Sequence, residues 1–154
     1  MTKRAKKVAI VMGSKSDEAA MKPAADMLEF FGIDYEIVVI SAHRMPNRTR
    51  QFVSDSQKSG VEIFIAGAGK AAHLPGVIAS FTTCPVIGIP IKTEDLGGID
   101  SLLSIVQMPP GVPVATVAIN GAKNAAILAA QILSLKYEEI NRKMAAYKKS
   151  LEES

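Results

Sequence analysis

Two histidines, His43 and His73, are the only ones in this chain of 154 residues. Histidine is the side chain whose ordinary pKa lies nearest to neutral pH, so it suits proton transfer. His43 stands in the run Ser41-Ala42-His43-Arg44, beside a hydroxyl and a guanidinium whose planar fork matches a phosphate group. We interpret this run as a candidate site for acid–base chemistry on an anionic substrate. His73 fits either a pocket or a polar contact between subunits.

A second polar run, Gly13-Ser14-Lys15-Ser16-Asp17, has the composition of a helix start. Glycine permits a tight turn, and Ser14 or Asp17 can cap the helix that follows. Free backbone N–H groups at such a start attract phosphate. The run is therefore either a phosphate site or an ordinary helix N-cap.

A glycine-rich run at residues 67–76 matches two nucleotide-binding motifs only in part. Its G-x-G-x-x-A spacing is that of a dinucleotide fingerprint, but that motif follows the first strand of a longer fold. A P-loop is excluded because residue 71 is Ala and residue 64 is Phe. We expect a flexible glycine turn that brings backbone close to a ligand, with His73 one turn into the next helix.

Short runs rich in Val and Ile alternate with segments of helical spacing, which predicts an α/β protein. The expected strands are Val8–Met12, Tyr35–Ile40, Val61–Ala66, Val86–Ile91 and Val114–Ile119. The expected helices are Ala19–Phe31, Pro46–Ser59, Ala71–Ser80, Ile99–Val106 and Asn124–Leu135. Right-handed crossovers between parallel strands make a three-layer α/β/α, doubly wound sheet, and five strands favour the flavodoxin-like order 2-1-3-4-5. The polar runs follow the first three strands, so we expect them to meet at the carboxyl edge of the sheet, where such folds bind ligands.

The chain ends in an amphipathic segment, Lys136–Leu151, whose apolar residues recur at three- and four-residue spacing. We expect an extra C-terminal helix within residues 136–154 that packs either on its own domain or on another subunit. The length of the chain predicts a single catalytic domain over residues 1–154.

The positive charge of the chain comes from a basic tail, which we place at residues 1–6. Lys and Arg number 18 against 15 Asp and Glu, but four of these cations lie within the first seven residues, so the rest carries a net charge of −1. Such a tail binds phosphate or anionic lipid, or only aids solubility. We expect no nucleic-acid partner, because the body is not basic and aromatic residues for base stacking are scarce.

The pattern of apolar residues predicts no membrane partner. No apolar run approaches the roughly 20 residues of a membrane span, and the first residues lack the apolar stretch of a signal peptide. The single cysteine, Cys84, cannot form an internal disulfide. We therefore expect a cytoplasmic protein.

Together these runs resemble one family closely: the bacterial-type N5-carboxyaminoimidazole ribonucleotide mutases of purine biosynthesis, also called the catalytic subunit of phosphoribosylaminoimidazole carboxylase. The matching stretches are MGSKSD at 12–17, SAHR at 41–44, AGAG at 66–69, AAHLPG at 71–76, DSLLSIVQMP at 100–109, GVPVATVAI at 111–119 and AKNAAILAAQIL at 122–133. They span nearly the whole chain in order. The AGAG and AAHLPG stretches resemble the mutase branch rather than the branch that uses carbon dioxide directly.

The resemblance implies an isomerase that moves a carboxylate from the exocyclic nitrogen of an aminoimidazole ribonucleotide to carbon 4 of the ring, without cofactor or metal. It implies that His43 is the catalytic acid and base. The implied binding residues are Ser14 and Arg44 for the 5′-phosphate, Asp17 for the ribose hydroxyls, Ser41 and the backbone of Gly67, Ala68 and Gly69 for the pocket wall, and His73 to help close it. It also implies a homo-octamer, whose contacts we expect on the segments 122–133 and 136–151.

Two residues depart from the family pattern. Met45 stands where Thr is usual, and Lys70 stands where Gly is usual. We expect Met45 to alter only a helix start. If the usual glycine has a positive φ, Lys70 is strained, and its charge either lies beside the carboxylate site or points to solvent.

Three other functions stay open at this point. The first is a direct carboxylase that adds free carbon dioxide to the unmodified ribonucleotide. The second is a flavodoxin-like module that binds FMN, although the three strand-end loops contain no Trp, Tyr or Phe to flank a flavin. The third is a phosphate-binding or interaction domain in which His43 is merely structural.

Overall fold

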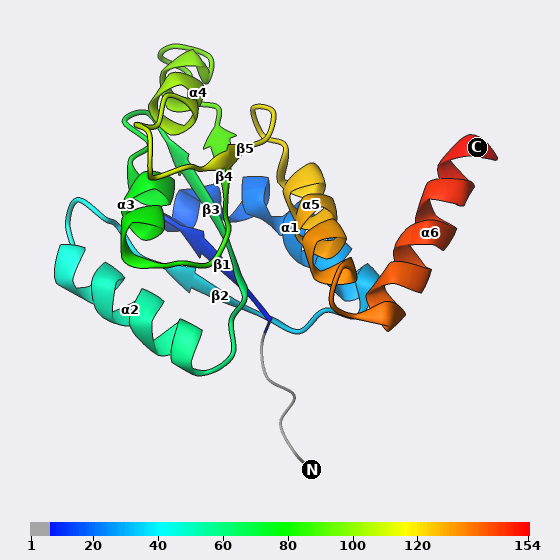
Figure 1. Cartoon of the computed structure of the whole chain (residues 1–154). Coiled ribbons are helices and arrows are strands. Elements are labelled where there is room, and N and C mark those ends of the chain that lie inside the picture. Colours follow the sequence, from blue (N-terminus) through cyan, green and yellow to red (C-terminus); the bar gives the residue numbers. More distant parts are fainter. Residues whose placement is uncertain (1–6) are drawn as a thin grey trace.

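The computed structural model describes residues 7–154 and contains one parallel five-stranded sheet between two layers of helices (Figure 1). The strands are β1 (Val8–Met12), β2 (Tyr35–Val39), β3 (Ile63–Gly69), β4 (Val86–Ile91) and β5 (Ala115–Thr116). Their order, β2-β1-β3-β4-β5, confirms the flavodoxin-like prediction. The expected basic tail, residues 1–6, lies outside the described residues.

The helices divide between the two faces of the sheet. They are a short 3-10 helix η1 (Lys15–Asp17) and the α-helices α1 (Glu18–Phe31), α2 (Pro46–Lys58), α3 (Leu74–Phe81), α4 (Ile99–Val106), α5 (Ala122–Ser134) and α6 (Glu138–Glu152). One core cluster joins α1 and α5 to the sheet, and a second joins α2, α3 and α4 to its other face (Figure 1). The chain winds from β1 outward to β2 and then to β3 on the other side of β1, so the strand order reverses there.

The central strands are buried on both faces, as their continuous apolar sequences predict. All five residues of β1 and all six of β4 are buried, whereas β2, at the edge, is only half-buried. Met12, the last residue of β1, is in register with Val39 of β2 and Gly67 of β3. The carboxyl ends of these strands therefore lie side by side, and the loops that follow them meet at one edge.

The prediction of a glycine turn in the run 67–76 is wrong for residues 67–69, which belong to β3. Gly67 and Gly69 lie within β3 and are in register with residues of β4. A Cβ atom on Gly67 would lie 2.2 Å from the Met21 Sδ, and one on Gly69 would lie 2.9 Å from the Thr93 Cγ2. These glycines let neighbouring side chains pack directly on the strand, which is a different use of glycine from a turn.

Two other boundaries differ from the prediction. Helix α3 begins at Leu74, with His73 just before it rather than one turn inside, because Pro75 is suited to the first helical turn. The fifth strand covers only Ala115–Thr116 instead of residues 114–119. The chain then continues beside β4 without a regular ladder, through a hydrogen bond from the Val117 N–H to the Gly88 carbonyl oxygen at 3.1 Å.

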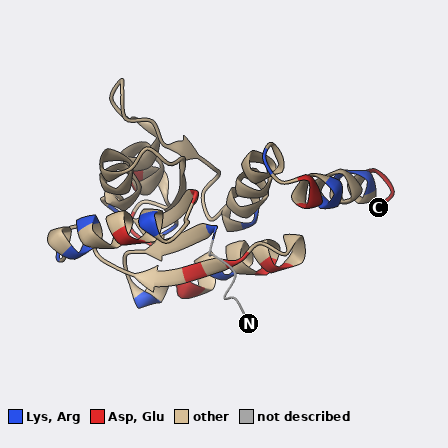
Figure 2. Cartoon of the chain, turned by 60° about the horizontal axis from the view of Figure 1, so that its bottom comes forward, with Lys and Arg blue, Asp and Glu red and all other residues tan. Residues whose placement is uncertain are grey.

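The C-terminal helix α6 packs on its own domain at one end and projects away from it at the other (Figure 1). Ile140 and Met144 are buried in the core cluster with α1 and α5, whereas Leu151 is exposed. The projecting part carries both basic and acidic side chains (Figure 2). Across residues 7–154, no helix combines the length and apolarity needed to cross a membrane.

A carboxylate, Glu62, ties the junction of α5 and α6 to the start of the sheet. It accepts a hydrogen bond from the Tyr137 hydroxyl and pairs with the ammonium groups of Lys136 and Lys7, each at 2.9 Å. Burial opposes its ionisation, but the hydrogen bonds from Tyr137, Lys136 and Lys7 outweigh that effect and lower the pKa of Glu62 to about 2. The charged cluster therefore stabilises the folded chain when Glu62 is ionised.

This cluster predicts a defined pH dependence of stability. Because the pKa of Glu62 falls from 4.5 to about 2 on folding, its contribution is complete above pH 4.5 and is lost as the pH falls toward 2. We expect Glu62→Gln to lower the free energy of unfolding by about 1 kcal/mol at pH 7, and the difference from wild type to vanish near pH 2. Urea unfolding at several pH values measures this. Glu152→Gln, on the exposed end of α6, is the control, and an equal loss at pH 2 and pH 7 would contradict the assignment.

Candidate active site

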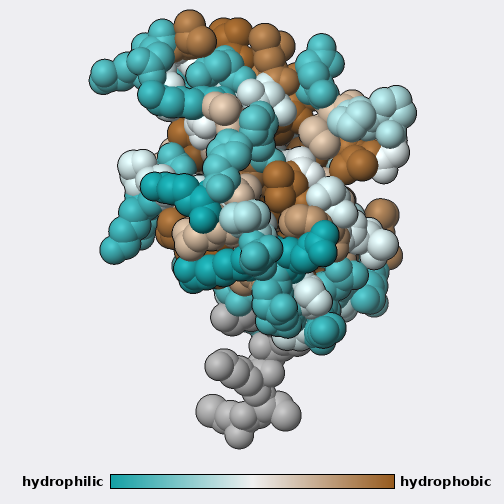
Figure 3. Space-filling view, turned by 90° about the vertical axis from the view of Figure 1, so that its left-hand side faces the viewer, coloured by the Kyte–Doolittle hydropathy of each residue, from teal (hydrophilic) through white to brown (hydrophobic). Residues whose placement is uncertain are grey.

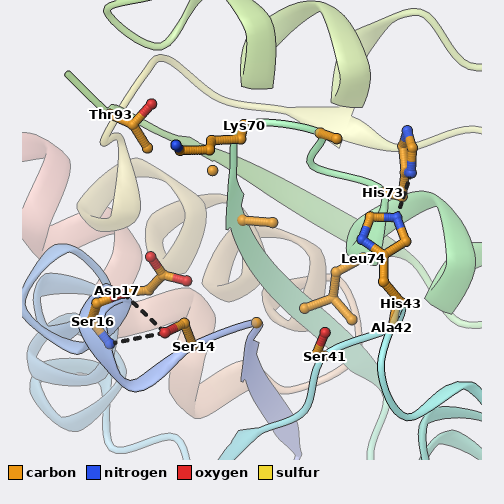
Figure 4. A pocket seen from close by; sticks show the side chains of 14 residues that line it. Ser14, Ser16, Asp17, Ser41, Ala42, His43, Lys70, His73, Leu74 and Thr93 are labelled. Atoms are coloured by element: carbon orange, nitrogen blue, oxygen red, sulfur yellow. Dashed lines mark hydrogen bonds between the residues drawn. The ribbon is translucent and has the colours of Figure 1, made fainter. Parts of the chain in front are cut away.

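A cavity of about 250 Å³ lies at the carboxyl edge of the sheet, where the strand order reverses (Figure 4). Its walls come from the segments that follow β1, β2, β3 and β4. The lining residues are Gly13, Ser14, Ser16, Asp17, Ser41, Ala42, His43, Ala68, Gly69, Lys70, Ala71, His73, Leu74 and Thr93. The cavity therefore brings together every predicted site residue except Arg44 and Gly67.

The wall after β1 is a helix start whose polar groups are close together. Ser14 has an extended backbone, and its Oγ accepts hydrogen bonds from the Ser16 N–H at 3.3 Å and the Ser16 Oγ at 2.9 Å. The Asp17 side chain is partly buried, and this burial raises the pKa of its carboxyl above the ordinary value. A backbone hydrogen bond at Ser14 acts in the opposite direction but is the smaller effect. Ser14 thus caps η1 as an ordinary N-cap does, and it also faces the cavity (Figure 4).

The wall after β2 is a tight turn that presents His43. Its anchor is Ser41, which is buried and accepts hydrogen bonds from the Met45 N–H at its carbonyl oxygen (2.8 Å) and from the Arg44 N–H at its Oγ (3.3 Å). Arg44 belongs to the same turn, but its side chain is exposed and does not line the cavity. Met45 is the residue before α2, where Pro46 opens the helix without a side-chain cap.

The two histidines meet across this cavity although 30 residues separate them. The His43 Nε2 lies 2.7 Å from the His73 Nδ1, and the ring planes are nearly perpendicular, at 85°. Only one proton occupies such a contact, so one ring donates and the other accepts. The second nitrogen of the His43 ring faces into the cavity (Figure 4), which leaves it free to exchange a proton with a ligand.

The wall after β3 carries Lys70, and the wall after β4 carries Thr93. Lys70 has a φ of +54°, which meets the condition under which strain is expected at this position. Its ammonium lies 2.5 Å from the Asp95 Oδ2, on the exposed rim of the cavity. Thr93 follows β4 and is not among the predicted site residues, because those all follow the first three strands. Its place after a predicted strand was the signal available.

The ionisable side chains of the described residues indicate which kinds of ligand this part of the chain could hold. Within residues 7–154, no three His, Cys, Asp or Glu side chains come close enough together to hold a metal ion. The ionisable groups that line the cavity are two imidazoles, one ammonium and one carboxylate. What the arrangement offers a ligand is therefore proton exchange, hydroxyl groups and backbone N–H groups.

The fold and the cavity define a flavodoxin-like α/β protein with a cavity at the switch point of its sheet, where such folds bind ligands. The family model described as AIR carboxylase matches residues 7–154. The chain belongs to the AIR carboxylase family.

Two of its relatives carry the same name, N5-carboxyaminoimidazole ribonucleotide mutase. The protein from Thermotoga maritima is 61% identical over 145 residues, which cover 94% of this chain and 85% of the relative. The protein from Pyrococcus abyssi is 59% identical, with 94% and 83% covered. The crystal structure of Treponema denticola PurE superposes with a TM-score of 0.88 at 31% identity and covers 95% of this chain and 91% of that one.

Proposed function

We propose that this chain is an N5-carboxyaminoimidazole ribonucleotide mutase of purine biosynthesis, an isomerase, and that its catalytic acid and base is His43. The observation that carries the role of His43 is its contact with His73, which occupies one ring nitrogen and leaves the other facing the cavity. We place the whole activity in one catalytic domain. The degree of identity to mutases, near 60% over 94% of the chain, supports this reaction over direct carboxylation.

The reaction requires one proton to be delivered and one to be removed. Protonated His43 donates its Nδ1 proton to the exocyclic nitrogen while the bond from that nitrogen to the carboxylate carbon breaks and carbon dioxide forms. Carbon 4 of the ring then attacks the carbon dioxide and forms a carbon–carbon bond. Neutral His43 takes the proton that carbon 4 loses, so the enzyme returns to its starting state and no atom is gained or lost.

His73 determines which nitrogen of His43 exchanges the proton with the substrate. When the Nδ1 of His73 accepts the Nε2 proton of His43, the lone pair of neutral His43 is on its own Nδ1, toward the cavity. The same nitrogen then serves both proton transfers. His73 is a positioning residue in this proposal, since it acts through His43 rather than on the substrate.

The other walls of the cavity are suited to hold a ribonucleotide. We assign Ser14 and the η1 start to the phosphate, because helix starts bind anions. We assign Asp17 to the ribose hydroxyls, as a hydrogen-bond acceptor. Ser41 and the backbone of Ala68 and Gly69 line the remaining surface, where the imidazole and the transferred carboxylate would lie.

The test of the proposed reaction uses purified protein and two substrates. We expect conversion of the N5-carboxylated ribonucleotide to the C4-carboxylated one without added bicarbonate. Incubation of the unmodified ribonucleotide with bicarbonate should be far slower at the same enzyme concentration. Efficient use of the second substrate alone would instead identify a direct carboxylase.

Arg44 should contribute to binding rather than to proton transfer. Its side chain does not line the cavity of a single chain, so a phosphate role requires it to turn inward or to serve a neighbouring subunit. We expect Arg44→Ala to raise KM by roughly 10- to 100-fold with kcat little changed, which is the loss of a charged hydrogen bond. Steady-state kinetics measures this, and a lower kcat at unchanged KM would contradict the role.

We propose a cytoplasmic homo-octamer as the working form, as the family resemblance implies. An exposed apolar stripe on and before α4, formed by Leu96, Ile99, Leu103 and Val106, supports a contact with another copy (Figure 3). The alanines of α5 do not supply that contact, because Ala125, Ala126, Ala129 and Ala130 are buried in the core of the same chain. Light scattering on the purified protein would give the number of subunits.

A further inference from the structure

Lys70 occupies a backbone conformation that its side chain disfavours. Among the described non-glycine residues, only Lys70, at +54°, and Asn120, at +56°, have a positive φ. The left-handed region is unfavourable for an L-residue with a long side chain, whereas Asn and Asp tolerate it. Something in the folded protein therefore holds Lys70 in place at the end of β3, on the rim of the cavity.

The Lys70 side chain forms an ion pair between two loops. The Lys70 Nζ lies 2.5 Å from the Asp95 Oδ2. Lys70 belongs to the segment after β3, and Asp95 belongs to the loop of residues 92–98 after β4, which is the neighbouring strand. The pair therefore joins the two walls on that side of the cavity. Both side chains are exposed, so the contact can break and re-form.

The loop of residues 92–98 forms part of the cavity through Thr93. The methyl carbon of Thr93 packs over Gly69, where an added Cβ would lie only 2.9 Å from it. The Thr93 Oγ1 is buried and has no hydrogen-bond partner among the described residues. The loop ends in Gly97 and Gly98, both with positive φ, a backbone conformation that glycine adopts at no steric cost. A shift of this loop would open the wall beside Gly69.

We propose that Lys70 and Asp95 form a latch that holds the 92–98 loop against the end of β3 and keeps carbon dioxide in the cavity between its release and its recapture. This inference rests on the proposed mutase function. Carbon dioxide is small and uncharged, so no ionic contact retains it and only closed walls do. An anionic ribonucleotide is held by polar groups as well, so loosening the latch affects carbon dioxide first.

The test compares retention of carbon in variants that keep the backbone conformation. Lys70→Asn removes the ammonium but tolerates a positive φ, and Asp95→Asn removes the partner charge. The double variant Lys70→Asp with Asp95→Lys restores a pair of opposite sign, again with a tolerated residue at position 70. Glu94→Gln is the matched control, since Glu94 lies on the same loop and forms no ion pair among the described residues.

The measurement is the incorporation of carbon from ¹³C-bicarbonate in the solvent into the C4-carboxylated product during turnover of unlabelled substrate. We expect each single variant to raise incorporation roughly two- to five-fold, as for loss of an exposed ion pair. The exchanged pair should return it toward the wild-type value, and Glu94→Gln should not change it. Unchanged incorporation in both single variants, or no recovery in the exchanged pair, would overturn the latch.

A second readout separates the latch from the reaction. Hydrogen exchange of the backbone amides of residues 93–98 should be faster in Lys70→Asn and Asp95→Asn than in wild type or Glu94→Gln. If wild type does not convert the substrate, the proposed function fails, and hydrogen exchange alone decides on the latch. Equal exchange in all four proteins would overturn it.

Discussion

Replacement of His43 by Asn is expected to lower kcat by at least about 100-fold, the contribution of a positioned acid–base group. Asn keeps a polar side chain in the same turn but cannot carry a proton from one atom of the substrate to another. The turn itself should persist, because the buried Ser41 and its hydrogen bonds to the Arg44 and Met45 N–H groups hold it. Single-turnover kinetics with the N5-carboxylated ribonucleotide measures the loss.

Ligand binding provides the control for this variant. His43→Asn should bind the unmodified ribonucleotide nearly as well as wild type, because the proposed phosphate and ribose contacts lie on the other wall, at Ser14 and Asp17. His73→Asn should show a smaller loss of kcat, about 10-fold, since it removes only the partner that orients His43. Near-normal turnover in His43→Asn would refute the catalytic assignment.

Replacement of Leu28 by Ala is expected to have the largest effect on stability. Leu28 lies on α1, is fully buried at 0% exposure, and belongs to the core cluster that includes α5 and the sheet. Truncation leaves a cavity between these layers, and such changes cost about 2–5 kcal/mol. That loss is a large part of the roughly 5–15 kcal/mol that stabilises an ordinary domain. The urea midpoint at constant m-value measures it.

An exposed leucine of the same chain provides the control for Leu28→Ala. Leu135, at the junction of α5 and α6, is 88% exposed. Leu135→Ala removes the same atoms without forming an internal cavity, so the free energy of unfolding should change by less than about 0.5 kcal/mol. Equal losses in the two variants would mean that Leu28 does not act through core packing.

Most of the fold could be predicted from the sequence, because buried parallel strands leave a strong local signal. The apolar runs at Val8–Met12 and Val86–Ile91 match β1 and β4 residue for residue, and Ile99–Val106 matches α4. The strand order followed from strand–helix alternation and right-handed crossovers. The ends of elements were less predictable, since the short β5 depends on which neighbours the chain reaches after Pro113.

The glycines of β3 show why the local signal fails in places. A glycine in a sequence indicates freedom of the backbone, and a turn was the natural expectation at residues 67–69. What decides between a turn and a strand is which side chains pack over the glycines, here Met21 and Thr93. Both lie far from β3 in the sequence, so only the folded chain brings them to these positions.

The sequence by itself determined which groups are candidates for the chemistry: the imidazole of His43, the hydroxyls of Ser14 and Ser41, and the edge of the sheet where they lie. Only the tertiary structure decided how these groups lie relative to one another. The pairing of His43 with His73, the place of Thr93 in the wall and the contact between Lys70 and Asp95 each join segments that follow different strands. Residue types and local spacing are properties of a short segment, whereas distances between side chains on separate strands exist only once the sheet has formed.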